Sequence, residues 1–89
     1  MKVSYRKLFL EDLARVPTAV RQRIEKFVFE EAPKLNALGE SGKIERLKGY
    51  KACYKIRFGD YRVGLKVVED ETISFERVLH RKEIYRFFP

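Results

Sequence analysis

Apolar residues in the first third of the chain recur at the spacing of an amphipathic helix, after one short alternating segment. Residues 2–5 alternate between polar and apolar side chains, which predicts a short strand. From Lys7 onward, the apolar residues that share one helix face are Phe9, Leu13, Val16, Val20, Ile24, Phe27 and Val28. Pro17 is tolerated only at a helix start or break, so two helices are expected to meet there. Pro33 disfavours helical geometry in the preceding residue, so the second helix should end near residue 31 or 32.

Beyond the helices, the period of the apolar positions changes to two. Residues 38–43 contain two glycines and are expected to form a surface loop, with one further helical turn possible at residues 34–38. The alternating segments that predict strands are residues 44–48, 53–58, 61–68 and 72–79. Gly59 and Asp60 form a two-residue hairpin connection, and residues 69–71 form a three-residue turn.

The order of these elements predicts an α+β fold. A strand and two helices precede an antiparallel meander, so the helices are expected to cover one face of the sheet. At the end of the chain, residues 82–89 can form a short helix or an aromatic tail that packs Tyr85, Phe87 and Phe88. Because the chain has 89 residues, a single domain over residues 1–89 is expected.

Composition narrows the class of protein. The chain has 45% hydrophobic residues, including five Tyr and seven Phe, which is enough apolar material for an ordered core. With one Cys and one His, it lacks a disulfide framework and the side chains of a usual zinc site, so no metal and no small-molecule cofactor are expected. No apolar run approaches the roughly 20 residues that span a bilayer, so a cytoplasmic protein with no membrane partner is expected.

The net charge of +7 is concentrated in the second half of the chain and points to a polyanionic partner. Residues 1–40 hold 8 basic and 6 acidic side chains, a difference of +2, whereas residues 41–89 hold 12 and 7, a difference of +5. One segment of this half contains a single acid, Asp60, and seven basic residues: Arg46, Lys48, Lys51, Lys55, Arg57, Arg62 and Lys66. This segment is the strongest candidate for a functional surface.

The predicted hairpin arranges these cations in a specific way. A two-residue turn pairs Arg57 with Arg62 and Lys55 with Gly64, on the face opposite the apolar residues of both strands. Like charges directly opposite each other destabilise a sheet, so sheet stability does not explain the arginine pair. A phosphate between them would turn repulsion into attraction, and Gly64 would leave space for such a ligand to approach. The simpler alternative is that these cations only solvate an exposed sheet face.

Three segments, RLKG (46–49), CYKIRFGDYRVGLKV (53–67) and LHRKEIY (79–85), together resemble the RelE family. The members of this family are ribosome-dependent messenger-RNA endonucleases of bacterial and archaeal toxin–antitoxin pairs. The resemblance covers essentially the whole chain. It implies messenger RNA on the ribosome as the substrate. It also implies a cognate RelB-like antitoxin that is acidic and partly disordered until it wraps the toxin.

The resemblance also assigns roles to individual residues. Lys55 matches the family's first catalytic lysine, and Arg57 its second basic position, where the family's lysine is replaced by arginine. Arg62 matches a phosphate-binding arginine. Near the end of the chain, Arg81 matches another catalytic arginine, and Tyr85 matches a tyrosine on which a base is expected to stack.

Two further residues are similar to the YoeB branch of the same family. Glu45 occupies the place of that branch's general base, and His80 lies near its C-terminal histidine. A regular register between the last two strands predicts that His80 shares the face of Arg62. The same register turns Arg81 away, unless a bulge or the end of the strand re-aims it.

Cleavage of RNA by its own 2′-hydroxyl requires a base, stabilisation of the phosphorane and an acid for the leaving oxygen. The base candidates are Lys55 and Glu45, and the hairpin arginines would clamp the phosphate. His80 or Arg81 would assist the leaving group. The remaining basic residues expected to bind RNA are Arg46, Lys48, Lys51 and Lys66.

Two other functions fit the same sequence. A toxin of the related ParE type shares the fold but acts on DNA gyrase without the catalytic basic set. A plain basic RNA-binding module would bind RNA with a steep salt dependence and leave it intact.

Overall fold

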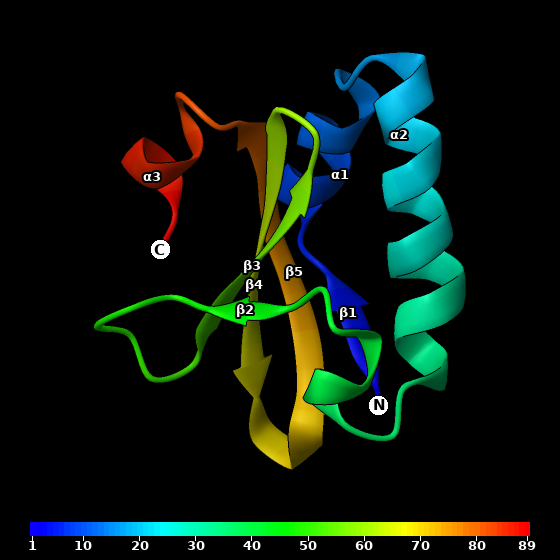
Figure 1. Cartoon of the computed structure of the whole chain (residues 1–89), viewed down its shortest axis with the longest axis vertical. Coiled ribbons are helices and arrows are strands. Elements are labelled where there is room, and N and C mark those ends of the chain that lie inside the picture. The colour runs from blue at the N-terminus through cyan, green and yellow to red at the C-terminus, as the bar shows by residue number, and fades with distance from the viewer.

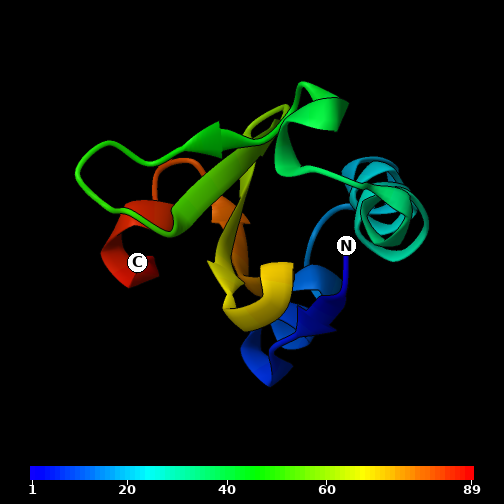
Figure 2. The same ribbon diagram turned by 90° about the horizontal axis from the view of Figure 1, so that it is seen from below.

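The computed structural model describes residues 1–89, apart from the side chain of residue 70. Its centre is a five-stranded sheet in the order β1-β5-β4-β3-β2. The strands are β1 (Val3–Tyr5), β2 (Glu45–Arg46), β3 (Cys53–Phe58), β4 (Tyr61–Val68) and β5 (Thr72–His80). Figures 1 and 2 show α1 and α2 on one side of this sheet and the C-terminal helix α3 on the other. The predicted α+β class is confirmed, and α1 and α2 cover one face as expected.

Two helices meet at Pro17, as the sequence predicts. Helix α1 spans Lys7–Ala14, and α2 spans Thr18–Glu25 with Pro17 at its N-cap. Helix α2 continues as the π-helical segment η1 (Lys26–Glu31), whose end agrees with the predicted helix end.

Short 3-10 turns follow η1. Pro33 is accommodated in η2 (Ala32–Lys34), because a proline near the start of a helical turn needs no N–H donor. The further turn expected at 34–38 forms instead at η3 (Leu38–Ser41).

The main core lies between the helices and the inner face of the sheet, which is the face toward α1 and α2. Its fully buried large side chains include Phe9, Phe27 and Phe75, and the ring of Tyr5 stacks on Phe75 with centroids 5.6 Å apart. The hydroxyl of Tyr5 donates a hydrogen bond of 2.6 Å to the carbonyl of Val28, and burial raises the pKa of this tyrosine. Ile56 and Val63 enter the same core from β3 and β4. These contacts fix which face of the hairpin points outward.

The hairpin of β3 and β4 has the predicted bounds and register. Arg57 pairs with Arg62 and Lys55 with Gly64 across the turn at residues 59–60. Gly59 has φ +59°, a conformation that favours glycine and fits the tight connection.

Four other predicted segments have a definite outcome. The strand expected at 44–48 is reduced to the two residues of β2, and β5 extends one residue beyond the expected 72–79. The turn at residues 69–71 is the 3-10 turn η4. The tail forms a short helix, α3 (Ile84–Phe87), so the first of the two expected arrangements is present.

The outer face of the sheet, opposite α1 and α2, carries a second, smaller apolar cluster. Ile84 and Phe88 of the C-terminal segment pack with Cys53 of β3, and Leu47 and Leu79 lie at the edge of this cluster. The outer face is therefore a solvated basic surface only where the C-terminal segment leaves it uncovered. Among the residues that the structure describes, no helix has the length and apolar character needed to cross a membrane.

A β-bulge interrupts the pairing of β4 with β5. Leu65 pairs with Phe75, whereas Gly64 pairs with Arg77, so Glu76 is an extra residue on β5. Because side chains alternate along a strand, the extra residue makes each later side chain of β5 point to the opposite face of the sheet from the one that a regular register predicts.

The side chain of Asp12 secures the segment that follows the bulge. Strand β1 pairs with β5 only as far as Phe75, and beyond this point Asp12 of α1 accepts the N–H of Val78 at 3.1 Å. The same carboxylate binds Arg77 in a bidentate ion pair, with N–O distances of 2.7 and 3.1 Å. Helix α1 therefore covers the part of the β5 edge that β1 leaves unpaired.

Candidate functional site

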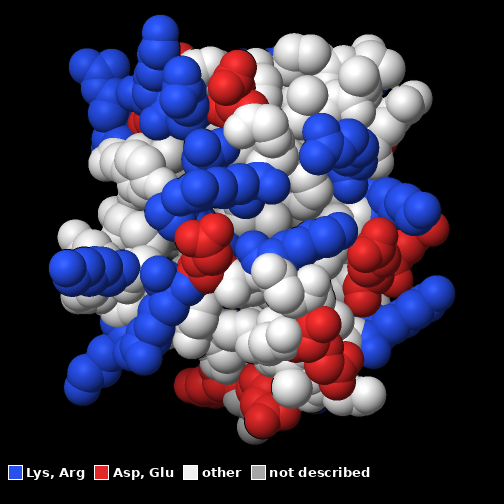
Figure 3. Space-filling view, in the orientation of Figure 1, with Lys and Arg blue, Asp and Glu red and all other residues white. Residues whose placement is uncertain are grey.

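The outer face of the β3–β4 hairpin presents Lys55, Arg57 and Arg62 side by side. The inner face of these strands is buried in the core, so alternation places the three cations outward. Figure 3 shows Lys and Arg side chains gathered over the upper and left parts of the face that bears β2, β3 and α3, with acidic side chains mainly lower. Three members of the predicted basic cluster, Lys55, Arg57 and Arg62, therefore share the outer face of the hairpin.

The paired arginines each have a partner within the protein. Arg57 Nε lies 3.7 Å from Glu45 Oε1, while Arg62 Nη1 donates to the carbonyls of Gly59 at 2.7 Å and Tyr61 at 3.0 Å. The two guanidinium groups are thus held by different neighbours, which lowers their mutual repulsion without a bound anion. The Arg57 ion pair is exposed and stabilises the fold little, so a phosphate can compete for it.

Glu45 lies inside the basic cluster. Strand β2 pairs Glu45 with Lys55, so this carboxylate is on the outer face beside the lysine and arginine of β3. Its ion-pair partner is Arg57. The site consequently contains one carboxylate among three cations.

Tyr85 reaches the same cluster from α3. Its hydroxyl lies 3.3 Å from Lys55 Nζ, which donates to it, and the ammonium is 5.7 Å from the centre of the ring. About half of the Tyr85 side chain is exposed, at 51%. The ring therefore has a free surface next to the cations, where a base could stack.

The expected position of His80 is wrong. Because of the bulge at Glu76, His80 pairs with Tyr61 and faces the inner side of the sheet, away from Arg62. Its ring meets the Tyr61 ring edge-on at 5.6 Å, and its Nδ1 accepts the N–H of Lys82 at 3.2 Å. The structure thus separates His80 from the cations of the outer face.

The bulge has the opposite effect on Arg81. In the shifted register, Leu79 pairs with Arg62, and Arg81 lies two residues further on, so it returns to the outer side. Its backbone N–H donates to the carbonyl of Asp60 at 2.7 Å, and its Nε lies 3.6 Å from Asp60 Oδ1. Arg81 is therefore placed at the turn of the hairpin, beside Arg62, as a bulge was expected to allow.

The four further basic residues do not form one group with this site. Arg46 pairs with Tyr54, an inner-face residue, so it points away from Lys55. Lys48 and Lys51 are exposed in the loop between β2 and β3, where they line a hollow of about 430 Å³. Lys66 lies on the outer face on the far side of Phe88, in a groove of about 590 Å³.

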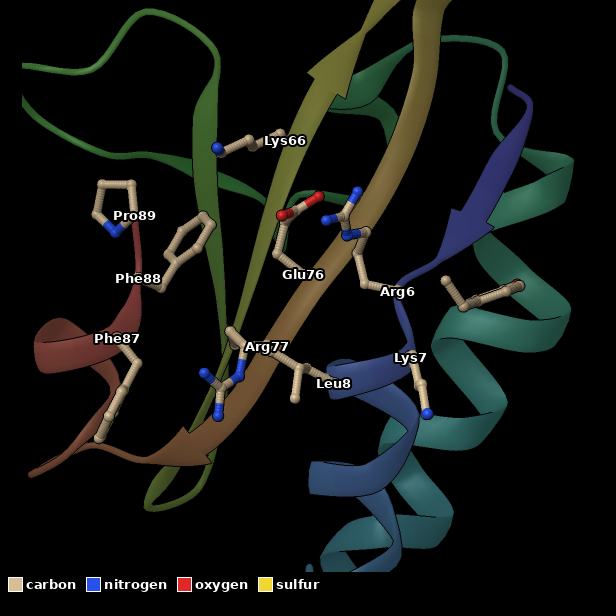
Figure 4. Close-up of a pocket in the computed structure, with 10 residues that line it drawn as sticks. Arg6, Lys7, Leu8, Lys66, Glu76, Arg77, Phe87, Phe88 and Pro89 are labelled. Carbon is tan, nitrogen blue, oxygen red and sulfur yellow. The ribbon is translucent and has the colours of Figure 1, made fainter.

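Gly64 has a different role from the expected one. The space above it is filled by the ring of Phe88, so it does not admit a ligand beside Lys55. Figure 4 shows Phe87 and Phe88 along one side of the groove that also contains Lys66 and Arg77. A bound anion would have to approach Lys55 from the side of Arg57 instead.

The ion pair of Asp12 and Arg77 was not predicted from the sequence. Both side chains are largely withdrawn from water, at 6% and 20% exposure, and the hydrogen bond to Asp12 raises the pKa of Arg77. A signal was present, because Asp12 falls three residues after Phe9 on the apolar stripe of α1. A buried carboxylate at such a position needs a partner.

Possible metal ligands are scattered over the fold. Within the part of the chain that the structure describes, no three side chains of His, Cys, Asp or Glu come together as a candidate metal site. The groups gathered around the outer face of the hairpin are three cations, the carboxylate of Glu45 and the phenol of Tyr85.

Comparison with known proteins gives concordant matches over nearly the whole chain. Residues 3–85 match the model of the ParE toxin of type II toxin–antitoxin systems, parDE. The chain is 48% identical to Toxin RelE3 of Methanocaldococcus jannaschii in an alignment of 90 residues that covers 100% of each protein.

Among the solved structures that share the fold are two archaeal complexes. The first is the RelB-RelE antitoxin–toxin complex from Methanococcus jannaschii, with a TM-score of 0.78 and 44% identity over 97% of this chain and 99% of that one. The second is the archaeal RelE-RelB complex from Pyrococcus horikoshii OT3, with a TM-score of 0.66 and 25% identity over 93% and 97% of the two chains.

Proposed function

Since this chain belongs to the RelE/ParE toxins of type II toxin–antitoxin systems, we propose that it cleaves messenger RNA in the A site of the ribosome. It would be an endoribonuclease that acts in the cytoplasm, where translation takes place. Cleavage of the message in this site stops translation, which accounts for toxicity.

One observation carries this proposal. Lys55, Arg57 and Arg62 converge on the outer face of one hairpin, with the half-exposed ring of Tyr85 beside them. Cations that surround a flat aromatic surface suit a single-stranded nucleic acid, whose phosphate binds the cations while a base stacks on the ring. The match to a RelE toxin at 48% identity favours cleavage over simple binding.

The proposed reaction uses the RNA itself as the nucleophile. The 2′-oxygen forms a bond to the adjacent phosphorus while the bond from phosphorus to the 5′-oxygen breaks, leaving a 2′,3′-cyclic phosphate and a 5′-hydroxyl end. Arg57 and Arg62 would hold the phosphate and stabilise the extra charge of the phosphorane. Because the nucleophile is internal and the cations supply charge stabilisation, we propose that no metal ion takes part.

Two residues are candidates for the base that takes the proton of the 2′-hydroxyl. Lys55 is favoured as the general base because it lies between Tyr85, on which a nucleobase would stack, and the arginines that would hold the phosphate. A lysine acts as a general base only through its neutral amine. Glu45 is the substitute, and it becomes free to accept a proton once a phosphate has taken over Arg57.

The leaving 5′-oxygen develops negative charge that needs a partner. Arg81 is favoured for this role over His80, because Arg81 lies at the turn beside Arg62 and His80 faces the other side of the sheet. Arg81 would stabilise the oxygen until water supplies its proton, since a guanidinium group does not readily give up its own.

Programmed ribosomes test the proposed function directly. Purified protein is added to ribosomes that carry a defined message, and the 5′ ends of the products are mapped. The account predicts cuts within the codon in the A site, and resistance of a message with 2′-deoxyribose at the cut position. Cleavage of the deoxy message would refute the 2′-hydroxyl mechanism, and intact parent message would refute the nuclease function.

We further propose an acidic RelB-like antitoxin as the partner that neutralises the toxin. The RelE proteins of the two archaeal complexes were solved with RelB, and the net charge of +7 suits an acidic chain. Exposed apolar side chains on α1 and η1 offer docking positions for its amphipathic segments: Leu8, Leu10 and Phe29. The antitoxin would act by covering the basic site or by displacing the tail.

The match of residues 3–85 to the ParE model makes a gyrase-directed toxin the second candidate. The retained cations at positions 55, 57, 62 and 81 argue against it, since a protein that only binds gyrase has no need of them. Loss of DNA supercoiling with intact messages would favour this candidate over the nuclease.

A further inference from the structure

One row of residues crosses the outer face of the sheet, with one residue from each of three neighbouring strands. Its members are Lys55 of β3, Gly64 of β4 and Arg77 of β5. Each lies against a different aromatic side chain of the C-terminal segment: Tyr85, Phe88 and Phe87, respectively. The bulge at Glu76 creates this row, because a regular register would put Glu76 opposite Gly64.

The middle contact of the row is the closest. A Cβ atom built on Gly64 would lie 2.5 Å from Phe88 Cδ2 and 2.6 Å from its Cγ, far inside normal contact distance. The backbone of Gly64 does not have a positive φ, so conformation does not require glycine at this strand position. Glycine weakens a strand interior, and here it permits the approach of a ring to the backbone. Phe88 is 3% exposed as a result.

We propose that Phe88, seated on Gly64, is the positioning residue that holds Tyr85 against Lys55. This inference rests on the proposed function, because Tyr85 and Lys55 belong to the proposed site. Tyr85 precedes Phe88 by three residues, which is nearly one helical turn, and Lys55 is the neighbour of Gly64 in the sheet. Seating the ring on the glycine therefore fixes the tyrosine over the lysine.

Helix α3 cannot hold this arrangement alone. It has four residues, and isolated helices of this length do not form in water because the first turn costs more than it gains. The C-terminal segment has two anchors on the sheet, the fully buried Ile84 of α3 and Phe88, which directly follows the helix. Without the Phe88 anchor, the turn that carries Tyr85 would lose its fixed position.

The far end of the row is also secured. The guanidinium of Arg77 lies 5.3 Å from the centre of the Phe87 ring and is itself held by Asp12. Phe87 is 52% exposed, so its contact with Arg77 leaves about half of the residue in solvent. Of the two phenylalanine contacts, the buried seat of Phe88 therefore holds the segment that carries Tyr85 more firmly than the Phe87 contact does.

Gly64→Ala tests the seat, with Gly39→Ala as its matched control. Gly39 has no atom within 4 Å of an added Cβ and no positive φ, so the same change there should leave activity unaltered. Gly64→Ala is expected to lower the single-turnover cleavage rate on programmed ribosomes by about 100-fold, the scale for a group misplaced by about 1 Å. Binding to the ribosome should stay within about threefold of the parent, since the other cations remain in place. A parental cleavage rate in Gly64→Ala would overturn the proposal.

A double substitution shows whether Phe88 acts through Tyr85. Phe88→Ala removes the ring without adding an atom beside Gly64, so it also serves if Gly64→Ala does not fold. Phe88→Ala combined with Tyr85→Ala should cleave at the rate of Tyr85→Ala alone, and Phe88→Leu should restore part of the rate lost in Phe88→Ala. Multiplied losses in the double variant would show a separate, merely structural role and overturn the proposal.

Nuclear magnetic resonance tests the seat even where the parent does not cleave RNA, an outcome that would refute the proposed function. In the parent, the Hα protons of Gly64 lie under the Phe88 ring and should be shifted upfield, with Overhauser contacts between the Tyr85 ring and the Lys55 side chain. Both signals should disappear in Phe88→Ala while the signals of the main core persist. Retention of the contacts between Tyr85 and Lys55 in that variant would overturn the proposal.

Discussion

The ion pair between Asp12 and Arg77 is expected to contribute a large part of the stability of the fold, and this contribution can be tested without any functional assay. Asp12→Ala removes both hydrogen bonds to the guanidinium of Arg77 and the acceptor for the N–H of Val78. Breaking a buried pair by removing one partner costs about 3–5 kcal/mol, because it leaves an uncompensated charge. The total stability of a chain of 89 residues is about 4–13 kcal/mol, so the loss is a large share of it.

Urea unfolding, followed by circular dichroism, measures this effect. With a slope of about 1–1.5 kcal/mol per molar urea, the midpoint of Asp12→Ala should fall by about 2–5 M, or the variant should be unfolded without urea. Glu30→Ala removes an exposed carboxylate from η1 and should change the free energy of unfolding by less than about 0.5 kcal/mol. A loss below about 1 kcal/mol in Asp12→Ala would show that this pair behaves like an exposed one, which would refute the reasoning.

Three further predictions concern the proposed roles of individual residues. His80→Asn should retain the parental cleavage rate, because His80 faces the inner side of the sheet, and a loss with an intact fold would restore it as a catalytic candidate. In single-turnover cleavage, Lys55→Ala should lose more activity than Glu45→Gln if lysine is the base, and the reverse order would make Glu45 the base. Lys48→Ala combined with Lys51→Ala should reduce the salt dependence of RNA binding by about two in the logarithmic slope, and an unchanged slope would exclude phosphate contacts there.

The local part of the fold could be predicted from the sequence. Strands β3 and β4 and their register follow from strict alternation and from a two-residue turn, both of which involve only neighbouring residues. The pairing of Arg57 with Arg62 and the placement of Lys55 on the outer face are consequences of that register. Both could therefore be predicted from local sequence alone.

The bulge could not be predicted in the same way. The segment that follows the bulge is held by a contact between Asp12 of α1 and Arg77 of β5, which are 65 residues apart in the chain. Because one extra residue reverses the facing of a strand, the bulge decides that His80 points inward and Arg81 outward. Sequence periodicity contains no information on such a long-range contact.

The role of Gly64 was misassigned for a related reason. Its place opposite Lys55 was correct, but the segment that fills the space above it comes from the end of the chain. The alternation of β4 gives no indication that the aromatic ring of Phe88 would lie there. The clue was the glycine itself, which marks a close approach in the middle of a strand without identifying what approaches.

The central claim is that the cations of the hairpin hold a phosphate during RNA cleavage, and Arg62 tests it most directly. The measurement is the single-turnover cleavage rate of Arg62→Ala on programmed ribosomes, beside Arg15→Ala, which removes an exposed arginine at the end of α1. The account predicts a loss of at least about 100-fold for Arg62→Ala with unchanged folding, and a parental rate for Arg15→Ala. A rate for Arg62→Ala within about threefold of the parent would contradict the claim.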